Sequence, residues 1–93
     1  MTSLKVGFLG LGKIGRLRLE VCQRLENVEI LGFFDPDPAT RTKAVFRFES
    51  ADELLTKEGL DAVFISVPNC FTVPYAVEAL KRGIAVFAEK PPA

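Results

Sequence analysis

Short apolar runs alternate with longer amphipathic stretches along this chain. Four runs have the length of strands and are apolar almost throughout: residues 4–9, 28–34, 61–67 and 84–88. Strands of this kind are typical of a parallel sheet that is buried on both faces. Because helical stretches separate them, the pattern predicts βαβ units and an α/β fold with a doubly wound parallel sheet between two layers of helices.

The helices are predicted by the stretches between these runs. The first is expected over residues 14–26, where apolar side chains recur at helical spacing and should pack on the sheet. These side chains are Ile14, Leu17, Val21 and Leu25.

The remaining helices are predicted from their start signals. Ser50 stands at capping-box spacing and should begin a short helix that Gly59 ends. Another helix is expected over residues 73–82, with Thr72 as its N-cap. Between the second strand and Ser50 we expect a short helix over 39–44 and a brief strand over 45–48.

The amino-acid composition argues against several kinds of partner and site. The chain has 93 residues, enough for one small domain, and its formal net charge is zero, which argues against nucleic acid or a charged membrane surface as partner. There is no His, and Cys22 and Cys70 stand far apart, so no metal site is expected. With no membrane-spanning run and no signal peptide, we interpret the protein as cytoplasmic.

A glycine-rich motif follows the first predicted strand. Gly10, Gly12 and Gly15 stand at G-x-G-x-x-G spacing, between a buried strand and an amphipathic helix. The first glycine permits a tight turn, the second removes a Cβ that would strike a pyrophosphate, and the third lets the helix sit close to the strand. The amides around Lys13 and Ile14 would then face the phosphates. Alternatively, the glycines serve only the turn.

Asp35 ends the second predicted strand, twenty residues after Gly15. A carboxylate there can accept hydrogen bonds from both hydroxyls of an adenosine ribose, and it would repel a 2′-phosphate. NAD is therefore expected as cofactor rather than NADP, unless Arg41 folds back to offset the repulsion. Alternatively, Asp35 only forms the turn before Pro36.

Two further segments follow strands at the same edge of the predicted sheet, where open α/β sheets bind ligands. Val67, Pro68 and Asn69 follow the third strand and can line the nicotinamide ribose, or can simply close the strand with a turn. Glu89 and Lys90 follow the fourth strand. Lys90 can reach a cofactor hydroxyl or a substrate oxygen, or it is an ordinary solvated lysine.

Taken together, these segments resemble the N-terminal half of the glucose-fructose oxidoreductase and inositol dehydrogenase family, often called Gfo/Idh/MocA. The Glu89-Lys90-Pro91 signature, one βαβ unit after Pro68-Asn69, discriminates best. The resemblance implies a Rossmann domain that binds NAD or NADP, in enzymes that transfer hydride to or from a sugar, polyol or related carbonyl compound. It assigns Asp35 to the ribose, residues 67–69 to the nicotinamide side, and Lys90 to the catalytic position. The residues that it assigns to the pyrophosphate are Gly10, Gly12, Lys13, Ile14 and Gly15.

The chain departs from the family pattern in three ways. Thr72 stands where the family often has His, and the segment from Asp35 to Ser50 is shorter than family members suggest. The chain ends at Ala93, whereas the family adds a helix and a strand, and then a second α/β domain that supplies the acid/base residues and most of the substrate pocket. We therefore expect residues 1–93 to be the dinucleotide-binding domain alone, without turnover.

Two rival hypotheses remain at this stage. One is a nucleotide-sensing module that binds NAD without any catalytic partner. The other is an inert fragment that associates with itself through the strand over residues 84–88, which is expected to lie at an edge of the sheet.

Overall fold

The computed structural model describes residues 3–67 and 69–88 and confirms the predicted doubly wound α/β fold. The described elements are β1 (Leu4–Leu9), α1 (Lys13–Gln23), β2 (Val28–Phe34), α2 (Ala51–Leu55), β3 (Ala62–Ile65), α3 (Asn69–Lys81) and β4 (Ala85–Ala88). Over this part of the chain, no helix is long and apolar enough to cross a lipid bilayer.

The strands form one parallel sheet in the order β2-β1-β3-β4. The chain steps outward from β1 to β2 and then returns across β1 to β3. The direction of winding therefore reverses between β1 and β3, and open parallel sheets bind ligands at the carboxyl edge of such a reversal. In this sheet, Phe8 of β1 lies in register with Phe33 of β2 and Phe64 of β3.

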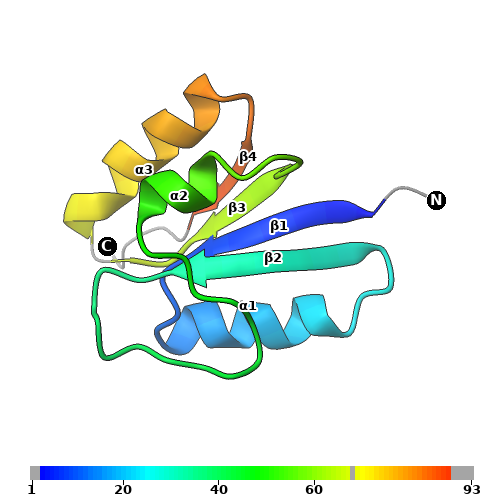
Figure 1. Ribbon diagram of the computed structural model, residues 1–93. Helices are drawn as coiled ribbons and strands as arrows, with labels where there is room; N and C mark the ends of the chain where they lie inside the picture. Colours follow the sequence, from blue (N-terminus) through cyan, green and yellow to red (C-terminus); the bar gives the residue numbers. More distant parts are fainter. Residues whose placement is uncertain (1–2, 68, 89–93) are drawn as a thin grey trace.

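Helices cover both faces of the sheet, so the predicted three layers are confirmed. Helix α1 lies on one face, and α2 and α3 lie on the other (Figure 1). The buried cluster under α1 consists of Val6, Phe8, Leu11, Leu19, Cys22, Phe33 and Ala62. The cluster under α2 and α3 consists of Leu9, Phe48, Leu54, Leu55, Leu60, Val63, Ile65, Ala79 and Ile84.

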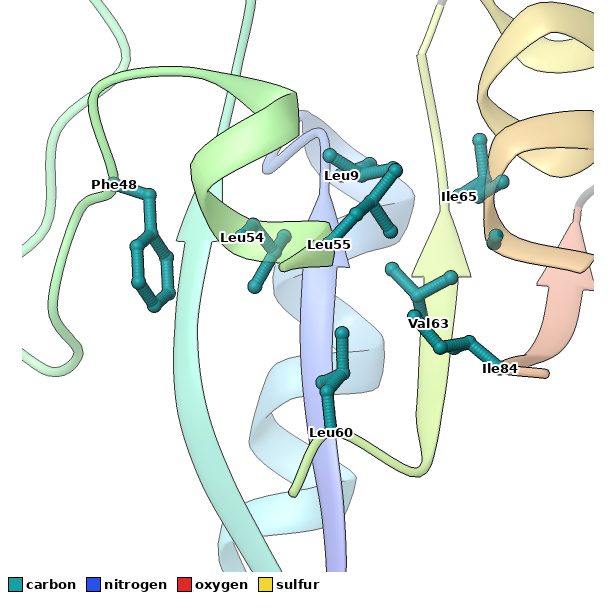
Figure 2. Packing of buried hydrophobic residues seen from close by; sticks show 9 residues of the cluster. Leu9, Phe48, Leu54, Leu55, Leu60, Val63, Ile65 and Ile84 are labelled. Carbon is teal, nitrogen blue, oxygen red and sulfur yellow. The ribbon is translucent and has the colours of Figure 1, made fainter. Parts of the chain in front are cut away.

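The short helix α2 sits close to the central strand β1. Figure 2 shows Leu54 and Leu55 of α2 directed toward the strands that carry Leu9 and Val63. Gly7 permits the close approach, because a Cβ at that position would lie 2.6 Å from a methyl group of Leu54 and would force that side chain to shift. Full burial of a leucine side chain contributes about 1.5–3 kcal/mol, so these contacts give α2 more stability than its five residues could supply alone.

The predicted buried face of the first helix is wrong. Gly15, Leu19 and Cys22 face the sheet, whereas Ile14, Leu17, Val21 and Leu25 are exposed. The exposed residues instead line an open groove of about 340 Å³ together with Arg18 and Phe64. The cause is the packing of Gly15 against the carbonyl of Gly10, which only a glycine allows and which sets the rotation of α1.

The starts of the other helices were predicted with mixed success. Ser50 caps α2 as expected, since its hydroxyl oxygen accepts a hydrogen bond from the Glu53 amide at 3.0 Å. The helix is shorter than expected, however, and ends at Leu55. Helix α3 begins at Asn69, so the prediction of Thr72 as N-cap is wrong. The Thr72 hydroxyl lies inside the first turn and donates to the carbonyl of Val67 at 3.4 Å.

Residues 36–50 form neither of the expected elements. There is no helix over 39–44, because the carboxylate of Asp37 takes up the amide of Ala39 in a turn. The expected strand over 45–48 is reduced to a single parallel bridge between Arg47 and Phe33.

Strand β4 lies at an edge of the described sheet, as predicted. Phe87 of this strand is 51% exposed and stacks on Phe64 with ring centroids 5.1 Å apart.

Candidate functional site

The glycines of the G-x-G-x-x-G motif have three different environments. Gly10 has φ of +98°, a left-handed conformation that favours glycine, and a Cβ there would overlap the carbonyl of Ser66. A Cβ on Gly15 would overlap the carbonyl of Gly10. Gly12, by contrast, has an extended backbone with φ of −71°, and beyond its chain neighbours no atom of the described residues lies within 4 Å of the place where its Cβ would be. Two glycines are therefore required by the fold, and the third faces open space.

Helix α1 begins directly at this open space. Gly12 is its N-cap, and no side chain caps the helix within the described residues. The first amides of a helix have no intrahelical acceptor, and the helix dipole adds a partial positive charge there. Lys13 and Ile14 are exposed at this end. The arrangement is chemically suited to an anion.

Asp35 lies beside this loop, at the carboxyl end of β2, and is only 9% exposed. One carboxylate oxygen accepts a hydrogen bond from the Leu11 amide at 2.8 Å, and the other accepts from the Asp37 amide at 2.8 Å. The bond from the Leu11 amide braces the glycine loop. The bond from the Asp37 amide forms the turn after Asp35, which was the alternative interpretation of this residue. A carboxylate has about four acceptor sites, so capacity for ribose hydroxyls remains.

Two arginines hold the segment after Asp35, and neither was predicted from the sequence. Arg47 donates from Nη2 to the carbonyl of Asp35 at 2.9 Å and from Nη1 to the carbonyl of Thr40 at 2.8 Å. Arg16 of α1 donates to the carbonyl of Arg41 at 3.0 Å. The signal for Arg47 was a single charged residue within the apolar run over 45–48.

The end of β3 completes the other side of the glycine loop. Val67 lies against Gly10, since its Cγ1 would be 2.8 Å from a Cβ on that glycine. The hydroxyl of Ser66 is buried and has no hydrogen-bond partner within the described part of the chain. Ser66 was not predicted from the sequence. Its hydroxyl offers a hydrogen-bond donor next to the glycine loop.

Three predicted residues, Pro68, Glu89 and Lys90, lie outside the described residues. Asn69 is described as the first residue of α3.

Helix α3 carries a tyrosine that was not predicted from the sequence and that is affected by the charge of Asp35. Tyr75 stacks on Phe71 with ring centroids 5.9 Å apart and packs against the core cluster under α2 and α3. The pKa of the Tyr75 hydroxyl is raised, first by burial and then by the charges of Asp35 and Cys70.

The described parts of the site converge on one edge of the sheet. The turn after β1, Asp35 after β2, and Val67 after β3 are adjacent because these three strands are neighbours. Open space at Gly12, uncapped helix amides and the orphan hydroxyl of Ser66 fit a diphosphate, and Asp35 fits an adjoining ribose. The residues present therefore fit a dinucleotide.

Comparison with known proteins agrees with this geometry. A family model described as "Oxidoreductase family, NAD-binding Rossmann fold" matches residues 4–93. The chain is 30% identical over 96 residues to an inositol 2-dehydrogenase from Corynebacterium glutamicum (strain R), in a match that covers 96% of this chain and 28% of that protein.

Solved structures show the same fold. An NAD-binding protein from Listeria innocua matches with a TM-score of 0.86 and 30% identity, over 97% of this chain and 28% of its own. Biliverdin reductase from Synechocystis sp. PCC 6803, in complex with biliverdin and NADP+, matches with a TM-score of 0.88 and 26% identity, over 95% of this chain and 29% of its own. The chain spans less than a third of each of these proteins. With the family model matched along nearly its whole length, the chain belongs to the Gfo/Idh/MocA oxidoreductase family, as an NAD-binding Rossmann domain.

Proposed function

We propose that the glycine loop and the N-terminus of α1 bind the pyrophosphate of NAD, with Asp35 accepting hydrogen bonds from the adenosine ribose. The observation that carries this proposal is the open space at Gly12. If the glycines served only a tight turn, Gly12 would need no glycine, because its backbone conformation suits any residue and no neighbour among the described residues restricts it. A ligand that approaches the backbone closely explains why a side chain is absent there.

Asp35 also supports NAD over NADP as the preferred cofactor. A 2′-phosphate at the ribose site would place additional negative charge near a buried carboxylate. At about 5 Å and an effective dielectric constant of about 20, each pair of unit charges repels by roughly 3 kcal/mol before screening. Arg41 is the residue that could offset this repulsion by folding back. It is exposed, and its backbone carbonyl accepts a hydrogen bond from Arg16.

For a complete enzyme that contains this domain, we propose hydride transfer to or from a sugar, polyol or related carbonyl compound. The bound nicotinamide supplies the hydride acceptor or donor. Val67, Pro68, Asn69 and Glu89 are proposed to line its side of the cofactor, and Lys90 to bind the reacting oxygen of the substrate as catalytic residue. The inositol 2-dehydrogenase among the relatives supports this substrate class.

The substrate pocket and the acid/base residues are proposed to come from the part of such proteins that this chain does not span. We therefore expect no turnover from the 93-residue chain, because hydride transfer needs a held carbonyl and a proton donor beside it. A fusion to the substrate domain of a relative should have dehydrogenase activity. The variant Lys90→Ala should lose that activity while it still binds NADH, and retained activity would remove Lys90 from the catalytic role.

Titration of the chain with NADH and NADPH, followed by fluorescence or calorimetry, tests the cofactor site. NADH should bind more tightly than NADPH, and Gly12→Val should abolish the binding of both. Because no described residue beyond its chain neighbours lies within 4 Å of the Gly12 Cβ position, this variant should still fold, and thermal unfolding of both proteins checks that it is folded at the temperature of the titration. Binding that survives in Gly12→Val would contradict the proposed pyrophosphate site, and a parent chain that binds neither nucleotide would favour the inert-fragment hypothesis.

We also propose that the protein is cytoplasmic and that the isolated chain associates with itself through β4. The exposed edge of this strand and the exposed ring of Phe87 support the second point. Sedimentation velocity should show an association that Phe87→Lys weakens.

A further inference from the structure

One guanidinium group holds the turn that carries the ribose carboxylate. Arg47 donates to the carbonyl of Asp35 and to the carbonyl of Thr40, five residues further along the turn. It therefore closes residues 35–40 into a loop with the guanidinium at its base. Both bonds, at 2.9 and 2.8 Å, have good hydrogen-bond lengths.

Arg47 is itself held firmly in place. Its backbone segment pairs with β2, since the amide of Phe33 donates to the carbonyl of Phe46 at 2.9 Å and the amide of Phe48 donates to the carbonyl of Phe33 at 2.7 Å. The guanidinium carbon lies 5.4 Å from the ring centroid of Phe33 and 5.6 Å from that of Phe34. A planar guanidinium can stack on rings and donate in two directions at once, whereas a lysine ammonium lacks this fork.

Few other contacts hold the turn. Apart from the bridge at Arg47, residues 36–50 have no regular secondary structure. Arg16 holds the carbonyl of Arg41, beyond the part that bears the carboxylate. The direction of the Asp35 side chain depends on its own backbone, whose carbonyl Arg47 fixes. Its two carboxylate bonds, to Leu11 and to Asp37, require that backbone to stay in place.

We propose that Arg47 is the positioning residue of the adenosine-ribose site: it acts through Asp35, holding the carboxylate where ribose hydroxyls can donate to it. This inference rests on the proposed binding of NAD. It assigns a specific role to a residue outside the glycine motif and outside the strand that bears the acid. A lysine at position 47 should fill this role poorly, because it cannot hold both carbonyls and both rings.

The test compares two ligands in three proteins. The ligands are ADP-ribose and an analogue that lacks both the 2′- and the 3′-hydroxyl on its adenosine ribose. The proteins are the parent chain, Arg47→Lys and the control Arg82→Lys. Arg82 also contacts two acceptors, Asp52 and Glu78, but it follows α3 at the opposite edge of the sheet. Thermal unfolding of each variant establishes that it is folded at the temperature of the titration.

Arg47→Lys should weaken ADP-ribose binding about tenfold, as expected for one impaired charge-assisted hydrogen bond. It should change binding of the dideoxy analogue less than twofold, because that ligand lacks both hydroxyls from which Asp35 would accept hydrogen bonds. Arg82→Lys should change neither. Equal weakening of both ligands in Arg47→Lys would mean a merely structural role and would overturn the inference, as would no weakening of either. If the parent chain binds neither ligand, the proposed NAD site itself fails, and the inference fails with it.

Discussion

Asp35 shows how much one buried residue contributes at the carboxyl edge of the sheet. Its charge is largely removed from water, which is unfavourable unless hydrogen bonds compensate. Two backbone amides, from Leu11 and Asp37, do so from within the chain. The same carboxylate therefore links the end of β2 to the glycine loop in the absence of a ligand, so the proposed phosphate and ribose sites are joined by one side chain.

Asp35→Asn should weaken both the fold and the cofactor site. An asparagine oxygen can accept from one amide, but its NH2 group then faces the other amide and leaves it unsatisfied. The expected loss is about 1–3 kcal/mol of unfolding free energy, measured by urea denaturation, together with weaker NADH binding. Asp37→Asn is the matched control. Asp37 is exposed, and its carboxylate accepts a hydrogen bond from the Ala39 amide. Equal stability losses in the two variants would contradict the bracing role of Asp35.

At the scale of elements, α1 carries two apolar stripes, and only one of them meets the sheet. The periodic stripe that includes Leu17 and Val21 is the more conspicuous in the sequence, yet it is exposed. The stripe through Gly15 and Leu19 is buried instead. Contact between Gly15 and the glycine loop sets the rotation of the helix, so the binding motif also decides which hydrophobic residues enter the core.

Alanine substitutions of neighbouring leucines should separate the two stripes. Leu19 is 5% exposed and Leu17 is 53% exposed. Leu19→Ala should lower the unfolding free energy by about 2–5 kcal/mol, because it leaves a cavity in the core. Leu17→Ala should lower it by less than about 1 kcal/mol, because about half of that side chain is already in water. Chemical denaturation measures both, and a larger loss in Leu17→Ala would restore the face that the periodicity predicted.

At the scale of the whole molecule, the order of the strands joins distant parts of the chain at one edge. The turn after β1 lies between Asp35, which follows β2, and the segment after β3. Helix α3 returns from that edge, and Tyr75 on it lies within the field of Asp35. The charge of Asp35, at the end of β2, therefore acts on a residue of the helix that follows β3.

Global stability should fall in alkaline solution because of Tyr75. Its pKa in the folded chain is raised above the ordinary value of 10.0, by burial first and by Asp35 and Cys70 next. The folded state then holds its proton more tightly than the unfolded state, so this contribution is complete below pH 10 and is lost as the pH rises through the folded pKa.

Unfolding free energies of the parent and of Tyr75→Phe, measured from pH 8 to pH 11.5, check this expectation. The difference between the two proteins should be constant at first and should change only above about pH 10. Taking the difference cancels the contribution of Cys22, whose pKa is also raised by burial and lowered in part by Arg18. A difference that stays flat to the highest pH would show that the pKa of Tyr75 is not raised.

Local sequence patterns predicted much of this protein correctly. Apolar runs located every strand, and Ser50 marked the start of α2, because strand burial and helix capping depend on residues close together in the chain. The spacing of the glycines and of Asp35 indicated a nucleotide-binding edge, because that motif places each residue at a known point of a single βαβ unit.

Other features were decided only by contacts between distant segments. The rotation of α1 depends on the Gly10 carbonyl, and the start of α3 at Asn69 depends on the turn that leaves β3. Arg47 gains its partners only because its segment pairs with β2. The sequence by itself thus indicated the described strands and three helices, and the edge of the sheet at which we propose that a dinucleotide binds, since both follow from short-range patterns. The tertiary structure decided which helix faces are buried and which side chains hold Asp35, since packing selects among residues that are equally suitable locally.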